Sequence, residues 1–480
     1  MNRFLIALAS LGLLMISFTS ALSQDGASSK TSQPAHPPAA ALRVGHNGRY
    51  LVDSQRQPFF WLGDTAWLLF QMTTREDADL YLRTRASQGF TVIQAALVMG
   101  EERVGGTLRP NVYGDLAFVG GNPASPLATP GKDVRQADEY DYWDHVDYVI
   151  ERAAAHRLTL GLLPLFIGYR GDGYKYLTPD RAYDYGLFLG RRYRSNPHLF
   201  WILGGDNTPD TEAKRKVWHE LARGITVGVA DQEDYRETLM TYHINGNHSS
   251  SQWFHQAPWL DFNMVQVWGN EKEIYPKLAQ DYQLTPVKPT GLGEGSYEDC
   301  PQYPTKPIDA FKVRKQAYWS YFAGGYHTYG NTNTWNFGSY KPEGTQNWKQ
   351  ALQSPGAIHL SVLTKLFASV EWWKLVPDPS VFVEGMGSGE TRHAAMRSTA
   401  GDRLLVYLSH PGTVSLRLDG ITAANAAQAT WVDPQTGTRT AIGQFPTAGK
   451  SSFSSPKGWL DAILLVEARR DSGRTVSGRR

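Results

Sequence analysis

Two carboxylate residues, Asp206 and Glu294, stand at the ends of short apolar stretches that finish in glycines. Asp206 follows two glycines in LFWILGGDN (residues 199–207), and Glu294 lies between two glycines in PTGLGEGSYE (residues 289–298). In a barrel of parallel strands, the residues just beyond the strand ends line the working face. Cleavage of a glycosidic bond needs one carboxyl group that protonates the leaving oxygen and a second that acts as nucleophile or base. The pair therefore predicts a glycoside hydrolase with Asp206 and Glu294 as its catalytic residues. Taken singly, Asp206 could also cap a helix and Glu294 could lie in an ordinary turn.

Between residues 59 and 330, eight apolar stretches alternate with segments of helical period. This alternation predicts an α/β fold, a (β/α)8 TIM barrel. An open, doubly wound sheet is the alternative, but no GxGxxG fingerprint opens a helix after any of the stretches. The predicted strands are residues 59–65, 90–98, 159–166, 199–204, 238–244, 262–268, 289–294 and 325–330. The predicted helices are residues 74–89, 142–156, 179–196, 211–224, a segment that begins at 271, 308–323 and 358–374.

The N-terminal 42 residues are expected to lie outside the folded domains. Residues 1–23 have the layout of a signal peptide, since Arg3 precedes an apolar run that ends in small residues before Gln24. An uncleaved anchor is the alternative. Residues 24–42 are rich in Ser, Gln, Pro and Ala and predict a disordered linker.

Two folded domains and a tail follow the linker. The Asn47-Gly48 pair predicts a hairpin that opens the barrel domain, residues 43–376. Short apolar runs separated by turns predict a small antiparallel β-sandwich over residues 377–468. The basic end, residues 469–480, predicts a disordered tail.

The amino-acid composition disfavours several classes of binding partner. With 48 basic and 46 acidic residues the net charge is +2, which gives no field that would favour nucleic acid or a membrane surface. Beyond the N-terminus, no stretch approaches the ~20 apolar residues of a membrane span. The single cysteine, Cys300, excludes an intramolecular disulfide and a multi-cysteine metal cluster. We expect an exported enzyme without cofactor whose partner is a polysaccharide or oligosaccharide; the sequence does not fix its oligomeric state.

Aromatic and polar residues near the predicted strand ends are candidates for sugar binding, because flat rings with polar edges suit the faces of sugars. Asp64, at the end of the first strand, offers a fixed acceptor at the barrel mouth or else an N-cap. The long segment 100–140, rich in Gly, Pro and Asn, is a candidate substrate cover. The predicted substrate-binding residues are Asp64, Trp67, Gln94, Asn207, Tyr242, His243, Trp268, His327, Tyr329 and Trp335.

Two other kinds of hydrolase have weaker support. A catalytic zinc usually takes three protein ligands, often two of them from one short motif, and the sequence has neither an HxxxH nor an HxH pair. We therefore predict no metal site, with a metal-dependent hydrolase as an alternative. A nucleophilic serine is disfavoured because GxSxG does not occur.

Four segments carry a resemblance to the apiosidase-like glycoside hydrolases: NGRYLVD (residues 47–53), PFFWLGDTAW (58–67), WILGGDN (201–207) and GGYHTYG (324–330). The resemblance extends from residue 43 to about residue 468 and includes WVDPQTG (431–437). It implies a bacterial (β/α)8 enzyme with a C-terminal β domain that carries a collagen-binding label. By resemblance Asp206 would be the acid/base and Glu294 the nucleophile of a retaining enzyme. The activity implied is release of apiose-linked side chains from the pectin rhamnogalacturonan II.

Other functions remain open on the sequence. A carbohydrate-binding protein without activity would keep the aromatic residues but would not need the carboxylate pair. A role as a matrix-binding adhesin is supported only by the collagen-binding label of the C-terminal domain.

Overall fold

The computed structural model describes residues 41–100, 108–136, 138–301, 308–339 and 347–469. The predicted signal peptide, nearly all of the predicted linker and the tail beyond Arg469 lie outside the described residues. Among the described residues, no helix is long and apolar enough to cross a membrane.

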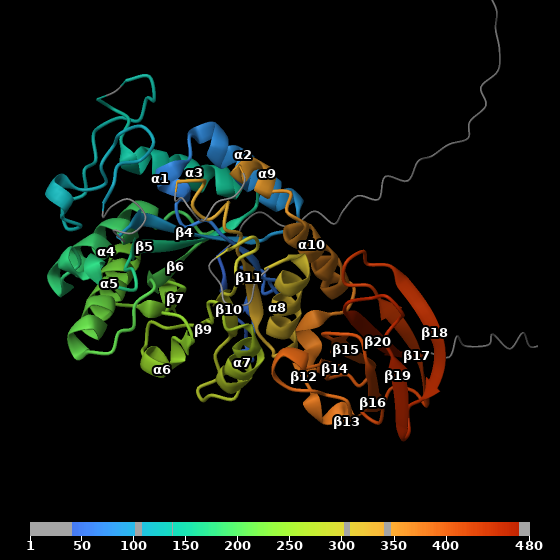
Figure 1. Cartoon of the computed structure of the whole chain (residues 1–480). Coiled ribbons are helices and arrows are strands. Elements are labelled where there is room, and N and C mark those ends of the chain that lie inside the picture. Colours follow the sequence, from blue (N-terminus) through green and yellow to red (C-terminus); the bar gives the residue numbers. More distant parts are fainter. Residues whose placement is uncertain (1–40, 101–107, 137, 302–307, 340–346, 470–480) are drawn as a thin grey trace, which may run out of the picture. The chain divides into compact units, whose positions relative to one another are not determined.

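Eight parallel strands form the centre of the barrel domain (Figure 1). Their order is β7-β6-β5-β4-β3-β11-β10-β9, with an added short strand, β8, antiparallel to β9. The two ends of this series meet, because the Asp261 amide donates to the Met240 carbonyl at 2.9 Å and the Thr241 hydroxyl to the Phe262 carbonyl at 2.7 Å. The predicted (β/α)8 barrel is confirmed. The strands are β3 (Leu62–Thr65), β4 (Val92–Met99), β5 (Thr159–Phe166), β6 (Leu199–Gly204), β7 (Met240–His243), β8 (His248–Ser249), β9 (Asn263–Gln266), β10 (Thr290–Glu294) and β11 (Tyr326–Tyr329).

Helices follow the strands and cover them from outside, as Figure 1 shows for α2 to α5. Thr74 caps α2 by accepting from the Asp77 amide, and Asp141 caps α3 in a reciprocal arrangement with Asp144. Pro179 begins α4 at the position where a missing N–H costs least. The α-helices are α1 (Leu69–Met72), α2 (Arg75–Ser87), α3 (Tyr142–Ala155), α4 (Pro179–Tyr193), α5 (Glu212–Ala230), α6 (Ser251–Phe254), α7 (Ile274–Tyr282), α8 (Ala310–Phe322), α9 (Trp348–Ala351) and α10 (Pro355–Ala368).

Short 3-10 turns connect several of these elements. They are η2 (Val119–Gly121), η3 (Asp172–Lys175), η4 (Tyr235–Glu237), η5 (Glu271–Glu273), η6 (Trp372–Lys374), η7 (Pro379–Val381) and η8 (Gly389–Thr391). The predicted last helix thus ends at Ala368, and the remainder of the predicted segment includes the separate turn η6.

Helix α5 runs six residues beyond Gly224, where the sequence predicted its end. Gly224 and Gly228 do not stop the helix but allow α4 to pack closely against it. A Cβ atom at Gly224 would lie 2.2 Å from the Tyr183 carbonyl oxygen, and one at Gly228 would lie 2.6 Å from that of Leu187. The helix ends instead at Ala230, and its C-cap residue Asp231 has a left-handed φ of 57°.

A hairpin precedes the barrel, as the Asn47-Gly48 pair predicted. Strands β1 (Arg43–Val44) and β2 (Leu51–Val52) pair antiparallel. Gly48 lies in the turn with φ of 70°, which a glycine adopts without strain.

The C-terminal domain contains two antiparallel sheets around their own core. One sheet has the order β12-β14-β15-β20-β17-β18 and the other β13-β16-β19. Side chains such as Val406, Val414 and Leu464 lie buried between them. The strands are β12 (Leu375–Pro377), β13 (Phe382–Glu384), β14 (Ala394–Ser398), β15 (Arg403–Leu408), β16 (Thr413–Arg417), β17 (Ala426–Val432), β18 (Arg439–Pro446), β19 (Lys450–Ser454) and β20 (Ala462–Ala468).

Candidate active site

The segment that carries Asp206 leaves β6 through two glycines in conformations that other residues rarely adopt. The φ angles are 102° at Gly204 and 136° at Gly205. A Cβ at Gly204 would lie 2.2 Å from the His243 carbonyl oxygen, and one at Gly205 would lie 2.4 Å from that of Ile167. The glycine pair therefore lets the chain pass between the ends of two neighbouring strands and deliver Asp206 to the barrel mouth.

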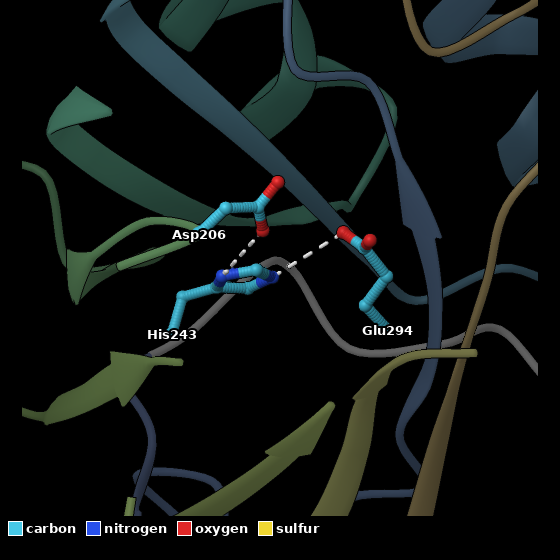
Figure 2. Close-up of side chains that lie close together, drawn as sticks. All are labelled: Asp206, His243 and Glu294. Atoms are coloured by element: carbon cyan, nitrogen blue, oxygen red, sulfur yellow. Dashed lines mark ion pairs between the residues drawn. The ribbon is translucent and has the colours of Figure 1, made fainter. Parts of the chain in front are cut away.

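Glu294 is the last residue of β10 and lies opposite Asp206. Its side chain is 8% exposed, whereas that of Asp206 is 20% exposed. One oxygen of each carboxylate and one ring nitrogen of His243 all lie within 4.8 Å of one another (Figure 2). The structure therefore brings together the two carboxylates that the sequence placed on separate strands.

His243, the last residue of β7, lies between the two carboxylates (Figure 2). Its Nε2 is 3.4 Å from Glu294 Oε2, and its Nδ1 is 3.9 Å from Asp206 Oδ1. The imidazole is fully buried. An imidazolium in this position would form an ion pair with both carboxylates.

Gln266, at the end of β9, contacts both carboxylates through one atom. Its Nε2 donates to Glu294 Oε1 at 2.7 Å and to Asp206 Oδ1 at 3.0 Å.

Trp67 and Tyr297 complete the surroundings of Glu294. The Tyr297 hydroxyl donates to Glu294 Oε2 at 2.8 Å, and Trp67 Nε1 donates to the same oxygen at 3.3 Å and to the Tyr297 hydroxyl at 3.1 Å. The Trp67 ring also meets His243 edge-on, with centroids 5.0 Å apart. Both oxygens of Glu294 thus accept hydrogen bonds, an arrangement that favours a carboxylate ion.

The charges of Glu294 and His243 support each other. Burial would raise the pKa of Glu294, but the imidazole of His243 and the hydrogen bonds from Gln266 and Tyr297 outweigh it and hold that pKa below its usual value. Burial would lower the pKa of His243, but the carboxylates of Glu294 and Asp206 outweigh it and raise that pKa. The site therefore favours an ionised Glu294 beside a protonated His243.

Asp206, His243 and Glu294 also form the kind of donor set that can hold a cation. The hydrogen bonds weigh against that use, because N–H and O–H donors occupy both oxygens of Glu294 and one of Asp206. A metal would have to displace these donors or share their lone pairs.

Asn207 directly follows Asp206 in the chain, and Trp268 lies two residues after Gln266. Trp268 follows β9 by two residues, is 44% exposed and has a left-handed φ of 49°. Non-glycine residues in this region often mark functional sites. Asn207 is buried, donates weakly to the Tyr169 carbonyl at 3.4 Å, and accepts through its own carbonyl from the Tyr242 hydroxyl at 3.3 Å.

Five other predicted sugar contacts are deeply buried. Asp64 pairs with Arg85 and Tyr81 at 2.5 Å each, and Gln94 donates to Thr65 and to the Gly293 carbonyl at 2.9 Å. The Tyr329 hydroxyl donates to Glu298 at 2.6 Å, and the His327 ring lies 3.3 Å from the Ser320 hydroxyl. The fifth, Tyr242, packs against Trp218 and Phe254. A direct sugar contact stays a prediction for these residues, and their burial favours a supporting role.

Trp335 is 7% exposed, and its carbonyl accepts from the Leu68 amide beside Trp67 at 3.1 Å. A sugar contact for Trp335 also stays a prediction.

The sequence reasoning missed Gln266 and Tyr297. Gln266 lies two residues inside the predicted sixth strand (262–268), so a rule that directed attention to strand ends passed over it; the observed strand β9 ends at Gln266. Tyr297 stands three residues after Glu294 in a turn, and no motif distinguishes it from the many other tyrosines.

Comparisons with known proteins agree with the fold. Residues 45–374 match the protein family described as "Apiosidase-like, catalytic domain", and residues 376–467 match "Putative collagen-binding domain of a collagenase". No curated protein matches the sequence. A solved structure described as "Glycoside hydrolase" is 30% identical with a TM-score of 0.78, over 90% of this chain and 97% of that one. A glycoside hydrolase family 5 structure from Bacteroides vulgatus is 29% identical, also with a TM-score of 0.78, over 89% and 93% of the two chains.

Proposed function

The chain belongs to the apiosidase-like family of glycoside hydrolases, and from that premise we propose a retaining mechanism with Asp206 as acid/base and Glu294 as nucleophile. The observation that carries the proposal is the short separation of the two carboxylates, of which one oxygen each lies within 4.8 Å. Retaining glycosidases hold their carboxyl groups about 5–5.5 Å apart, whereas inverting ones keep roughly 6.5–9.5 Å for a water molecule.

The surroundings of the two carboxylates support these separate roles. Glu294 accepts from Gln266, Trp67 and Tyr297 and lies beside His243, which favours the charged form that a nucleophile needs. Asp206 has the more exposed side chain, so it can exchange its proton with solvent and reach a leaving group.

The reaction follows in two displacements. In the first, Asp206 gives its proton to the glycosidic oxygen while Glu294 attacks the anomeric carbon, so the bond to the leaving group breaks and an ester bond forms. In the second, Asp206 takes a proton from water, the water oxygen attacks the anomeric carbon, and Glu294 leaves as a carboxylate.

As substrate we propose a plant or algal polysaccharide, with apiose-linked side chains of rhamnogalacturonan II as the first candidate. The family resemblance supports this choice, and the half-exposed indole of Trp268 offers a surface on which a sugar ring can stack.

We also propose that the protein is exported, because residues 1–23 have the layout of a signal peptide. Expression of the full chain in a bacterium, followed by fractionation and N-terminal sequencing, tests this. A product that begins at Gln24 outside the cytoplasm supports export, and an uncut cytoplasmic product contradicts it.

Hydrolysis by purified protein that begins at Gln24 tests the activity. Rhamnogalacturonan II oligosaccharides and other pectic and algal glycans are incubated with the wild type, Glu294→Gln and Asp206→Asn. Glu384→Gln, on exposed β13, is a matched control for the change of carboxylate to amide. We expect the two site variants to lose about 10²–10⁴-fold or more in rate while the control is unaffected. Full activity of either site variant would contradict the assignment.

A metal-dependent hydrolase is the second candidate, because Asp206, His243 and Glu294 lie close enough to share a cation. Treatment with a chelator and elemental analysis distinguish a metal-dependent hydrolase from the proposed metal-free glycosidase. Activity that a chelator removes and zinc restores would favour the metal enzyme.

A further inference from the structure

Gln266 occupies a special place in the barrel, at the carboxyl end of β9 beside β10. It is the ladder partner of Glu294 in the parallel pairing of these strands. Its side chain is buried, with only 2% of the residue exposed. The sequence motifs give it no role, and the mechanism above uses only its hydrogen bond to Glu294.

The side-chain amide of Gln266 has two N–H bonds, and its Nε2 lies within hydrogen-bond distance of both carboxylates. The distances from Nε2 are 2.7 Å to Glu294 Oε1 and 3.0 Å to Asp206 Oδ1. We propose that Gln266 is a positioning residue that holds the acid/base and the nucleophile at the separation for double displacement and couples their charges. The proposal rests on the proposed function of this pair.

The reverse orientation of the amide is excluded when both carboxyl groups are ionised, because Oε1 would then face two other oxygen atoms. In the observed orientation Oε1 is buried, and no hydrogen-bond donor reaches it among the described residues. A buried acceptor without a partner costs free energy. The observed orientation therefore turns the N–H donors of the amide, and not its oxygen, toward the two carboxylates.

Two shared N–H bonds also limit how far apart the two carboxylates can move. Both accepting oxygens stay within hydrogen-bond reach of one nitrogen, so a gap wide enough for the water of an inverting enzyme cannot open between them. When Glu294 becomes an ester, its oxygens accept hydrogen bonds less well, while the bond to Asp206 remains. Gln266 then supports Asp206 as it takes up the proton of the attacking water.

A donor shared by two carboxylates favours the charged form of each. The other groups that face the pair are His243 from β7, Trp67 from the segment after β3 and Tyr297 from the segment after β10. They remain when Gln266 is replaced, so its loss should raise the pKa values of both carboxyl groups. Both limbs of the bell-shaped pH profile of kcat/KM should then move to higher pH, since one limb needs Glu294 ionised and the other needs Asp206 protonated.

Gln266→Met tests the proposal, because methionine keeps the length and volume of the side chain and removes the donors. We expect both limbs to rise by about one pH unit, the equivalent of one charged hydrogen bond, and kcat to fall about 10²-fold with little change in KM. Gln316→Met is the matched control. Gln316 is a buried glutamine of α8 whose side chain, among the described residues, exchanges hydrogen bonds with the Ser296 main chain near the site. If the two limbs of the pH profile do not shift in a folded Gln266→Met variant, the proposal is overturned.

Gln266→Asn provides a second variant if the methionine variant does not fold. It keeps the amide but is one methylene shorter, so it cannot reach both carboxylates, and the same shift of both limbs is expected. An unshifted profile in a folded Gln266→Asn variant would overturn the proposal as well.

A measurement without substrate separates this proposal from the proposed function. The titration of His243 is followed by NMR of ring-labelled histidine, with His243→Gln to assign its signal among the 13 histidines. Carboxylates that lose a hydrogen-bond donor attract the imidazolium more strongly. The pH midpoint of the His243 titration should therefore be higher in Gln266→Met than in the wild type, and it should be unchanged in Gln316→Met. If the wild type cleaves no glycan but this midpoint rises, the charge coupling holds and the glycosidase assignment fails. An unchanged midpoint would overturn the coupling itself.

Discussion

His243 allows two acidic side chains to share one buried site. Two carboxylates this close repel each other when both are ionised, and burial strengthens the repulsion. An imidazolium between them, 3.4 Å from Glu294 and 3.9 Å from Asp206, offsets it. With Asp206 protonated, Glu294 and His243 then form a neutral pair, which is the state that the first displacement requires.

Replacing His243 by glutamine should move the acidic limb of the pH profile to higher pH. The imidazole holds the pKa of Glu294 below its usual value, so its loss raises that pKa and delays the ionisation of the nucleophile. Measurement of kcat/KM against pH checks this. His198→Gln is the control, since His198 is buried just before β6 and contacts the Ile150 carbonyl. An unshifted acidic limb in His243→Gln would show that the ion pair does not set the charge of Glu294.

Replacing Trp268 should weaken substrate binding but should change the stability of the folded protein little. Both Trp268→Ala and Trp268→Gly should raise KM about tenfold, on the order of 1.4 kcal/mol for a lost stacking surface. Because φ is 49°, glycine relieves backbone strain that alanine retains, so Trp268→Gly should be at least as stable as Trp268→Ala. Kinetics and thermal unfolding of both variants check this. An unchanged KM would remove Trp268 from the substrate site.

At the scale of the elements, the barrel could be predicted because both faces of its strands are buried. β4 and β5 are buried throughout, so apart from Gln94 and Thr159 each is an apolar stretch in the sequence. The strand ends then located Asp206 and Glu294. Their distance could not be predicted, since it depends on how Gly204 and Gly205 turn the chain between Ile167 and His243.

Elements without an apolar pattern escaped prediction. Strand β18 is exposed at most positions, because it lies at the edge of its sheet, and it carries no run of buried side chains. Gly224 of α5 was predicted to end the helix but serves close packing, a distinction that depends on the neighbouring helix α4. Asp64 was predicted to bind substrate because it lies at the end of the first strand, yet its partner Arg85, on α2, lies 21 residues further along the chain.

The Asp64–Arg85 pair should stabilise the barrel by connecting β3 to α2. Both side chains are fully buried, so Arg85→Met leaves a buried carboxylate without its cation and should cost about 3–5 kcal/mol. Arg236→Met is the control, because that guanidinium is 88% exposed and pairs only at the surface. Urea unfolding checks the difference. If Arg85→Met kept its stability but raised KM, Asp64 would belong to the substrate site after all.

At the scale of the whole molecule, the barrel and the β-sandwich share a buried polar contact. Arg314 of α8 pairs with Asp461 beside β20 at 2.6 Å, and Asp461 also accepts from Tyr407 at 3.0 Å. The rings of Tyr318 and Tyr407 stack across the same contact with centroids 4.7 Å apart. The two domains should therefore unfold together.

Removing this contact should separate the two unfolding events. We expect a single calorimetric transition for the wild type, and for Arg314→Met a loss of about 3–5 kcal/mol with two transitions. Arg403→Met is the control, since Arg403 pairs with Glu467 within the sandwich alone. A wild-type protein that already unfolds in two steps would contradict the shared contact as a stabilising feature.

The stereochemistry of hydrolysis tests the central claim most directly. Proton NMR of the first sugar released from an active glycan records its anomeric configuration before it equilibrates in water. Because the Asp206 and Glu294 carboxylates approach within 4.8 Å, we predict a product with the same configuration as the substrate, formed by the wild type and not by Glu294→Gln. A product of inverted configuration, or the same product from Glu294→Gln, would contradict the account.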